Sequence, residues 1–222
     1  MEAYRDDLAL VLPTLVCVVA VGALLVAEQR DSRLGILVGK LVAASAYVWS
    51  ALSWGALQSS YGRWLLVGLV FCWWGDVLLV PRHHRGAFRA GIIAFLLGHV
   101  AYVVAFCQHR IERWGLMLGA GLAVILAAFV ARWLGPKLPG AFRKLVWAYV
   151  VVISCMLIAA LGAARGSGPL GIAFGAVLFA VSDLTVARDR FVSHAFANRL
   201  VGLPLYFAAQ LVLAHTVVSI PA

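Results

Sequence analysis

Long apolar runs dominate the chain and are separated by short segments that contain charged residues, glycine or proline. A helix that crosses a bilayer needs about 17 to 25 predominantly apolar residues. Runs of this length predict eight membrane-spanning helices in an all-α fold, a polytopic transmembrane bundle in which residues 1–222 form a single domain. The predicted spans cover residues 8–27, 34–57, 63–80, 88–107, 114–134, 143–163, 169–187 and 199–219.

Composition supports this interpretation, since 64% of the 222 residues are hydrophobic and only 12% are charged. A soluble domain of this size is far less apolar. The N-terminal stretch "MEAYRDDLAL" contains acidic residues and leads into an apolar run longer than the core of a signal peptide. The first run is therefore predicted to be retained as a membrane span.

The cysteines and the net charge argue against two other classes of protein. The four cysteines lie singly within apolar runs, and none forms the closely spaced pair that is typical of zinc sites. The net charge of +9 comes from residues in short loops, where lysine and arginine set topology and contact lipid head groups. We therefore predict no cofactor, no metal ion and no nucleic-acid partner.

Lysine and arginine residues are distributed unequally between the two sides of the predicted bundle. The loops that follow the first, third, fifth and seventh spans contain twelve of the 18 basic residues, and the opposite side contains five. The remaining one, Lys40, falls inside the second span. By the positive-inside rule, the side with twelve is predicted to be cytoplasmic and both termini extracytoplasmic. In a bacterium this corresponds to a multi-pass protein of the inner membrane.

Two acidic residues interrupt the spans near their predicted cytoplasmic ends. Asp76 and Asp183 each lie four residues before the end of a span, which places them about 6 Å inside it. A charged residue facing lipid costs at least about 2.5 to 3.5 kcal/mol, so both acids are expected to face a polar cavity inside the bundle. Five further polar residues of the spans share this half of the bilayer: Lys40, His99, Tyr149, Tyr206 and Gln210.

Each of these residues also has a purely structural interpretation. A single acid could cap a helix or pair with a loop arginine, a histidine could bond between packed helices, and a tyrosine could anchor the protein at the interface. However, 23 residues separate Asp76 from His99, and 23 also separate Asp183 from Tyr206, in each case across one basic loop. This matched spacing leads to the hypothesis that the bundle consists of two parallel four-helix halves.

Four segments resemble a known family. "GDVLLV" with "FRAGIIAFLLGHVAYVVAF", and "GAVLFAVSDLTVARDRF" with "LYFAAQLVL", resemble the lysoplasmalogenase family of multi-pass membrane proteins. Members of that family cleave the vinyl-ether bond of lysoplasmalogens, lyso-alkenyl glycerophosphoethanolamines or glycerophosphocholines, to a fatty aldehyde and a glycerophospho-base. The resemblance implies the same enzyme activity here, with functional positions at Lys40, Asp76, His99, Tyr102, Tyr149, Asp183, Tyr206 and Gln210.

The chemistry of this reaction fits the two carboxyl groups independently. A vinyl ether is hydrolysed when its β-carbon is protonated, and water then attacks the resulting oxocarbenium-like cation. Two carboxyls can divide these tasks if one keeps a proton and the other stays ionised. We therefore predict Asp76, Asp183 and His99 as catalytic residues, with His99 activating the water or positioning an acid. Which aspartate is the acid remains open, and Lys40 is expected to influence that choice.

The remaining predicted substrate contacts are Lys40, the three tyrosines and Gln210 named above, together with basic residues that follow each acid. Arginine suits a lipid phosphate because its planar fork donates two hydrogen bonds at once. The single alkenyl chain would then run outward between the helices, and the expected partners are a lysophospholipid substrate and membrane lipids. Any one of these arginines could instead serve only to set orientation. The predicted phosphate contacts are Arg82, Arg85, Arg89, Arg188 and Arg190.

Two other functions remain open at this point. Buried charges could line the substrate or proton path of a transporter or receptor, although the outer halves of the relevant spans are almost wholly apolar. Aspartate and histidine could instead hold zinc in a metal-dependent lipid amidase or esterase. Such sites usually have three protein ligands, and His99 is the one histidine placed deep inside a span.

Overall fold

The computed structural model describes residues 2–81 and 84–219, with the side chains of residues 2–9 left undescribed. Within this part the chain forms eight long helices and two short 3-10 helices, and no strand. The long helices are α1 (Glu2–Gln29), α2 (Arg33–Ser53), α3 (Ser60–Leu78), α4 (Arg85–Phe106), α5 (Arg113–Trp133), α6 (Gly140–Arg165), α7 (Leu170–Phe191) and α8 (Phe196–His215). The 3-10 helices are η1 (Gly135–Lys137) and η2 (Thr216–Ser219).

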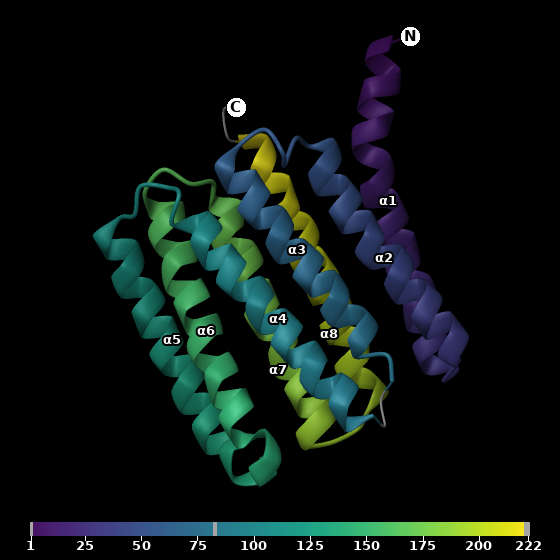
Figure 1. The fold of residues 1–222 in the computed structure, drawn as a ribbon, viewed down its shortest axis with the longest axis vertical. Helices are drawn as coiled ribbons and strands as arrows, with labels where there is room; N and C mark the ends of the chain where they lie inside the picture. The colour runs from purple at the N-terminus through teal and green to yellow at the C-terminus, as the bar shows by residue number, and fades with distance from the viewer. Residues whose placement is uncertain (1, 82–83, 220–222) are drawn as a thin grey trace.

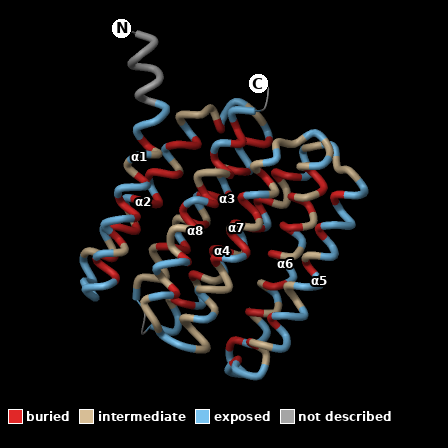
Figure 2. The backbone as a smooth tube through the Cα atoms, turned by 180° about the vertical axis from the view of Figure 1, so that it is seen from behind, coloured by how far each residue is buried: buried red, intermediate tan, exposed pale blue. Residues whose placement is uncertain are grey.

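The predicted all-α bundle is confirmed. Seven of the eight helices are long and apolar enough to cross a membrane, as judged over the described residues. The exception is α3, which is 19 residues long and includes Arg63, Asp76 and three tryptophans. Many large apolar residues of the outer helices α1 and α5 are exposed, and much of the backbone of these two helices is pale blue in Figure 2. An exposed apolar surface of this extent suits lipid, and the protein is an integral multi-pass membrane protein.

Several predicted helix ends are wrong by a few residues. The second span was predicted to reach residue 57, but α2 ends at Ser53, and Gly55 follows with φ of 86°. The seventh was predicted to end at residue 187, but α7 continues to Phe191 because alanine and arginine favour the helix there. The eighth begins at Phe196 rather than residue 199. Basic residues assigned to the seventh loop therefore lie in helical turns.

The helices run alternately up and down, and both termini lie at the upper end of the bundle in Figure 1. Four helical hairpins pack closely, namely α1 with α2, α3 with α4, α5 with α6, and α7 with α8. The loops within these hairpins all lie at the lower end in Figure 1. We call this end the basic end, because these are the loops and helix ends with the twelve lysine and arginine residues counted above.

The contacts between hairpins follow a repeated pattern. Helix α2 packs against α3 and α8, and helix α6 packs against α7 and α4. If α1–α4 correspond to α5–α8 in order, each half contributes its last helix to the other half. This exchange agrees with two parallel four-helix halves, since four crossings return the chain to its starting side.

Small residues bring α3 and α4 close together beneath the site. A Cβ atom at Gly68 would overlap the ring of Tyr102, and one at Gly98 would lie 2.8 Å from Sγ of Cys72. Close backbone approach of this kind is a common way to pack helices in a membrane. It fixes His99, the neighbour of Gly98, in the centre of the bundle, where its side chain is fully buried.

Candidate functional site

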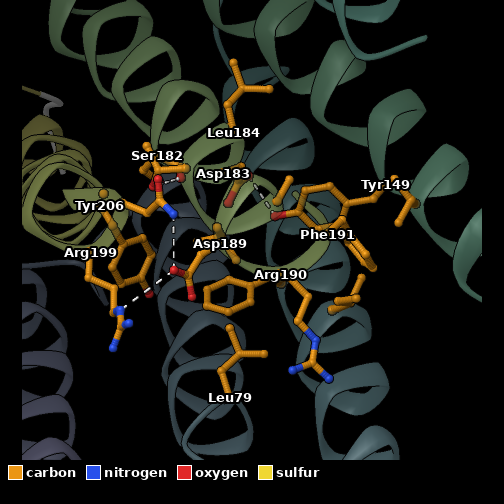
Figure 3. Close-up of a pocket in the computed structure, with 18 of the residues that line it drawn as sticks. Leu79, Tyr149, Ser182, Asp183, Leu184, Asp189, Arg190, Phe191, Arg199 and Tyr206 are labelled. Atoms are coloured by element: carbon orange, nitrogen blue, oxygen red, sulfur yellow. Dashed lines mark hydrogen bonds and ion pairs between the residues drawn. The ribbon is translucent and has the colours of Figure 1, made fainter. Parts of the chain in front are cut away.

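A cavity of about 220 Å³ lies toward the basic end of the bundle, and residues from all eight helices line it. Both predicted acids, Asp76 of α3 and Asp183 of α7, belong to its lining. Figure 3 shows Asp183 at this cavity together with Tyr149 and Tyr206. Two carboxyl groups that are 107 residues apart in the sequence thus share one internal space.

Asp76 accepts hydrogen bonds from two tyrosines of different helices. Its Oδ2 lies 2.6 Å from the hydroxyl of Tyr206 and 3.3 Å from that of Tyr47. Behind Tyr206, the side-chain amide of Gln210 donates to the Tyr206 hydroxyl at 3.0 Å, and Tyr102 donates to Gln210 at 2.7 Å. Asp76 is only 3% exposed, so its carboxylate is held in one position by a buried hydrogen-bond network.

Asp183 has a different set of partners. The hydroxyl of Tyr149 donates to Oδ2 of Asp183 at 2.8 Å, and Nε2 of His99 lies 3.7 Å from the same oxygen. Nδ1 of His99 lies 2.6 Å from the carbonyl oxygen of Phe95. Because a carbonyl only accepts, Nδ1 must carry the hydrogen, and in the neutral imidazole Nε2 faces Asp183 with its lone pair. The Asp183 side chain is 21% exposed, so this acid is open to the cavity.

The two acid sites are equivalent under the repeat of the fold. Asp76 on α3 contacts tyrosines on α2 and α8, whereas Asp183 on α7 contacts a tyrosine on α6 and a histidine on α4. Tyr206 and His99 therefore occupy corresponding places, each 23 residues after its acid in sequence but beside the acid of the other half. The sites differ in chemistry, because a hydroxyl at one is replaced by an imidazole at the other.

The cavity is charged at one side and apolar at the other. The charged side is formed by Glu28 of α1, Lys40 of α2, Asp189 of α7 and Arg199 of α8, with His194 of the loop between α7 and α8, whereas Arg190 of α7 extends over Phe88 at the apolar side. The apolar side is formed by α4, α5 and α6, with Phe88, Ile92, Leu126, Val130, Val146, Val150 and Ile153. Through their hydrogen-bond partners, Asp76 belongs to the charged side and Asp183 to the apolar side.

The predicted substrate contacts are divided between the cavity wall and the layer behind it. Lys40, Tyr149 and Tyr206 line the cavity with the two acids. His99, Tyr102 and Gln210 are fully buried behind that wall and are not among the lining residues. His99 therefore faces Asp183 rather than the open space.

The arginines predicted to contact the phosphate do not gather at the cavity in the described chain. Arg190 lines the cavity, and its guanidinium carbon lies 4.2 Å above the ring of Phe88. The guanidinium of Arg89 instead donates to the carbonyl oxygen of Ala141 at 3.4 Å, which ties α4 to α6.

Neither Arg85 nor Arg188 is among the residues that line the cavity. Arg188 bonds to the side-chain oxygen of Asn198, Arg85 is exposed at the start of α4, and Arg82 lies outside the described residues. Of the five, only Arg190 is therefore placed at the cavity in the part of the chain that the structure describes.

Sequence reasoning missed Tyr47, Glu28 and Arg199. Tyr47 follows Lys40 by seven residues, which is two helical turns on one face, and that spacing could have identified it. Arg199 had been counted as a loop charge because the start of α8 was placed too late. No spacing links Glu28 to Arg199, since 171 residues separate the two partners of this ion pair.

Over residues 2–81 and 84–219, no group of three or more histidine, cysteine, aspartate or glutamate residues is arranged to hold a metal ion.

The sequence profile of the YhhN family matches residues 35–217, which include every site residue described above except Glu28. The chain belongs to the YhhN family. This membership, with relatives that carry the name lysoplasmalogenase, confirms the family resemblance seen in the sequence. No solved structure gives a significant match to this YhhN protein.

Curated relatives of this YhhN protein come from animals and bacteria. It is 36% identical to lysoplasmalogenase TMEM86A of Bos taurus over 161 residues, which is 70% of this chain and 65% of the relative. It is 32% identical to lysoplasmalogenase TMEM86A of Homo sapiens, with the same coverage. The lysoplasmalogenase of Mycobacterium bovis is 30% identical over 66% of this chain and 56% of its own length. The matched region thus spans just under two thirds of the first two relatives.

Proposed function

We propose that this YhhN protein hydrolyses the vinyl-ether bond of lysoplasmalogens inside the membrane. The observation that carries the proposal is the cavity that Asp76 and Asp183 share in unequal environments, the first beside charged residues and the second beside apolar residues. Relatives named lysoplasmalogenase support the choice of substrate. The products are a fatty aldehyde and a glycerophospho-base.

The two sides of the cavity give the substrate a direction. A lysoplasmalogen has a charged head group, a glycerol unit, the vinyl-ether bond and one long hydrocarbon chain, in that order. With the head group at the charged side, the chain occupies the apolar side between α4, α5 and α6. The glycerol end of the vinyl ether then lies nearer Asp76, and the β-carbon, which bears the chain, lies nearer Asp183.

Asp183 is the acid in this arrangement. Its hydrogen bond from Tyr149 uses Oδ2, which leaves Oδ1 to carry the proton. The proton adds to the β-carbon with the electron pair of the double bond, and the α-carbon and its oxygen share the resulting positive charge. His99 is a positioning residue here, because it contacts Asp183 and not the cavity.

Asp76 stabilises the cation. Two tyrosine hydroxyls donate to its Oδ2, and hydrogen bonds to a carboxylate favour the charged form. A fixed negative charge close to the developing cation costs no reorganisation when the reaction occurs, which is the usual source of electrostatic catalysis. Lys40 lines the same cavity, on the head-group side.

Water completes the reaction and restores the acid. It attacks the α-carbon, and its proton passes to the ionised Asp183, which gives a neutral hemiacetal and a protonated Asp183. The hemiacetal then collapses as its hydroxyl proton passes, by way of Asp76, to the glycerol oxygen while the carbon–oxygen bond breaks. One water is consumed, and both carboxyls return to their initial states.

The direct test is aldehyde release by the purified protein in detergent or lipid nanodiscs. We expect turnover of a lysoplasmalogen, and no turnover of the matched alkyl ether, which has no double bond to protonate. Parallel reactions with and without a chelator determine whether a metal ion takes part. Binding of the lysoplasmalogen without any aldehyde would contradict the proposed hydrolysis and favour a transport or receptor function.

We also propose that the basic end faces the cytoplasm, which puts the cavity on the cytoplasmic side. The unequal distribution of basic residues supports this orientation. A reporter fused after Ala222 is then expected to be active outside the cytoplasm, whereas one inserted between α5 and α6 is expected to be active inside. A cytoplasmic signal from the C-terminal fusion would overturn the proposed orientation but not the chemistry.

A further inference from the structure

The two helices that contribute tyrosines to Asp76 share a second feature. In α2, Lys40 precedes Tyr47 by seven residues, and in α8, Arg199 precedes Tyr206 by seven residues. Both helices begin at the basic end (Figure 1), and seven residues are about two turns on one helix face. Each helix therefore places a cation on the basic-end side of a tyrosine that bonds Asp76, and both cations line the cavity.

Lys40 is a buried cation that forms no ion pair with the described residues. Its exposed fraction is 9%, although it lines the cavity. Among the residues that the structure describes, no carboxylate lies within 4.0 Å of its ammonium group. A charged group this far inside a membrane protein is costly unless a partner compensates it. A ligand with a negative charge would supply that partner.

Arg199 is held at the cavity by acidic residues of two other helices. Its Nη1 lies 2.9 Å from a carboxylate oxygen of Glu28 on α1, and its Nε lies 3.8 Å from Oδ1 of Asp189 on α7. The contact with Asp189 is visible in Figure 3. The Nε–H group is buried and has no hydrogen-bond acceptor in the described chain. Glu28 is 5% exposed, so the guanidinium is fixed by a buried anion.

We propose that Lys40 and Arg199 form the subsite for the phosphate of the substrate, with Glu28 positioning Arg199. This inference rests on the proposed function and deepens it, because it assigns the phosphate to α2 and α8 rather than to the arginines that follow the acids. An arginine fork and a lysine point charge are complementary ligands for a phosphate monoanion or diester.

The spacing along the helices fits the length of the substrate. Seven residues of helix advance roughly 10 Å from each cation toward its tyrosine. In a lysoplasmalogen, about six covalent bonds of roughly 1.5 Å separate the phosphorus from the α-carbon of the vinyl ether, a span of at most roughly 8 Å. A phosphate bound between the cations therefore brings the vinyl ether to the level of Asp76.

The test compares two substrates that differ only in the phosphate. One is a lysoplasmalogen, and the other is the corresponding 1-alkenylglycerol, which has the same vinyl ether but no phosphate. We expect Arg199→Gln and Lys40→Gln to raise KM for the lysoplasmalogen by roughly ten- to a hundred-fold, as for a lost charged hydrogen bond. The KM for the alkenylglycerol should remain within about two-fold, and Arg199→Lys should recover part of the loss.

Two further variants control for folding and for general charge. Arg199→Gln removes the ion pair between Arg199 and the buried Glu28 carboxylate, so the double variant Glu28→Gln with Arg199→Gln tests the same loss without that buried charge. Arg132→Gln removes an exposed arginine in the last turn of α5, at the same end of the bundle but outside the cavity. We expect the double variant to retain the phosphate-specific effect and Arg132→Gln to match the wild type.

Binding of the uncleavable alkyl ether separates this inference from the proposed function. If the wild type binds alkyl-glycerophosphoethanolamine more tightly than alkylglycerol, both cation variants lose this preference and no aldehyde is released from the alkenyl forms, the result supports the phosphate subsite and contradicts the hydrolase function. If aldehyde forms but both cation variants affect the two substrates equally, the subsite is wrong. A phosphate-specific loss in Arg190→Gln alone would likewise overturn it and place the phosphate beside α4.

Discussion

Replacing Asp183 by asparagine is expected to lower kcat for aldehyde release by about 10²- to 10⁴-fold, the usual contribution of a positioned acid. Asparagine keeps the size of the side chain and accepts the hydrogen bond from Tyr149. It has no proton acidic enough to transfer to carbon, and it cannot take the proton of the attacking water. Because Asp183 acts at both steps of the proposed reaction, its loss should affect kcat far more than KM.

The measurement is steady-state aldehyde release by variants that elute and melt like the wild type. Asp31→Asn is the matched control, since Asp31 is exposed in the turn between α1 and α2 with φ of 49°, a conformation that asparagine tolerates. We expect this control to retain full activity. If folded Asp183→Asn protein kept near-normal kcat, Asp183 could not be the acid, and the direction proposed for the substrate would fail with it.

The convergence of Asp76 and Asp183 could be predicted because it depends on features that sequence reports well. Apolar runs locate the spans, loop charges orient them, and the cost of a carboxylate in lipid indicates that both acids face inward. The depth estimate was less reliable. Asp183 lies eight residues before the end of α7 rather than four, and Asp76 only two before the end of α3. Both acids nevertheless line the same cavity, because the ends of α3 and α7 do not lie at the same depth in the bundle.

The partners of the acids could not be predicted in the same way. To predict a pairing such as Tyr47 with Asp76, one must know which helices are in contact. The two halves exchange their last helices, so that α8 contributes a partner of Asp76 and α4 contributes a partner of Asp183. The 23-residue spacing indicates that His99 and Tyr206 are equivalent positions. It would, however, pair each of them with the acid that precedes it in the sequence. Tertiary packing reverses that pairing, which no local pattern records.

The second large effect is expected at Asp76. Asp76→Asn should lower kcat by about 10²- to 10³-fold, comparable to the loss of one preorganised electrostatic group in other active sites. The carboxylate is surrounded by donors, with Tyr206 at 2.6 Å and Tyr47 at 3.3 Å. The carbonyl oxygen of asparagine can still accept these hydrogen bonds, but asparagine provides no negative charge to stabilise the cation and no site to relay the hemiacetal proton.

Double variants test whether the tyrosines act through this carboxylate. Tyr206→Phe removes the shorter of the two hydrogen bonds, and we expect a smaller loss in kcat than for Asp76→Asn. If Tyr206 serves only to hold and polarise Asp76, the double variant Asp76→Asn with Tyr206→Phe should be no worse than Asp76→Asn alone. Additive losses would instead mean that the Tyr206 hydroxyl acts on the substrate directly. A folded Asp76→Asn protein with unchanged kcat would remove the electrostatic role and leave Asp183 to act as a single catalytic carboxyl.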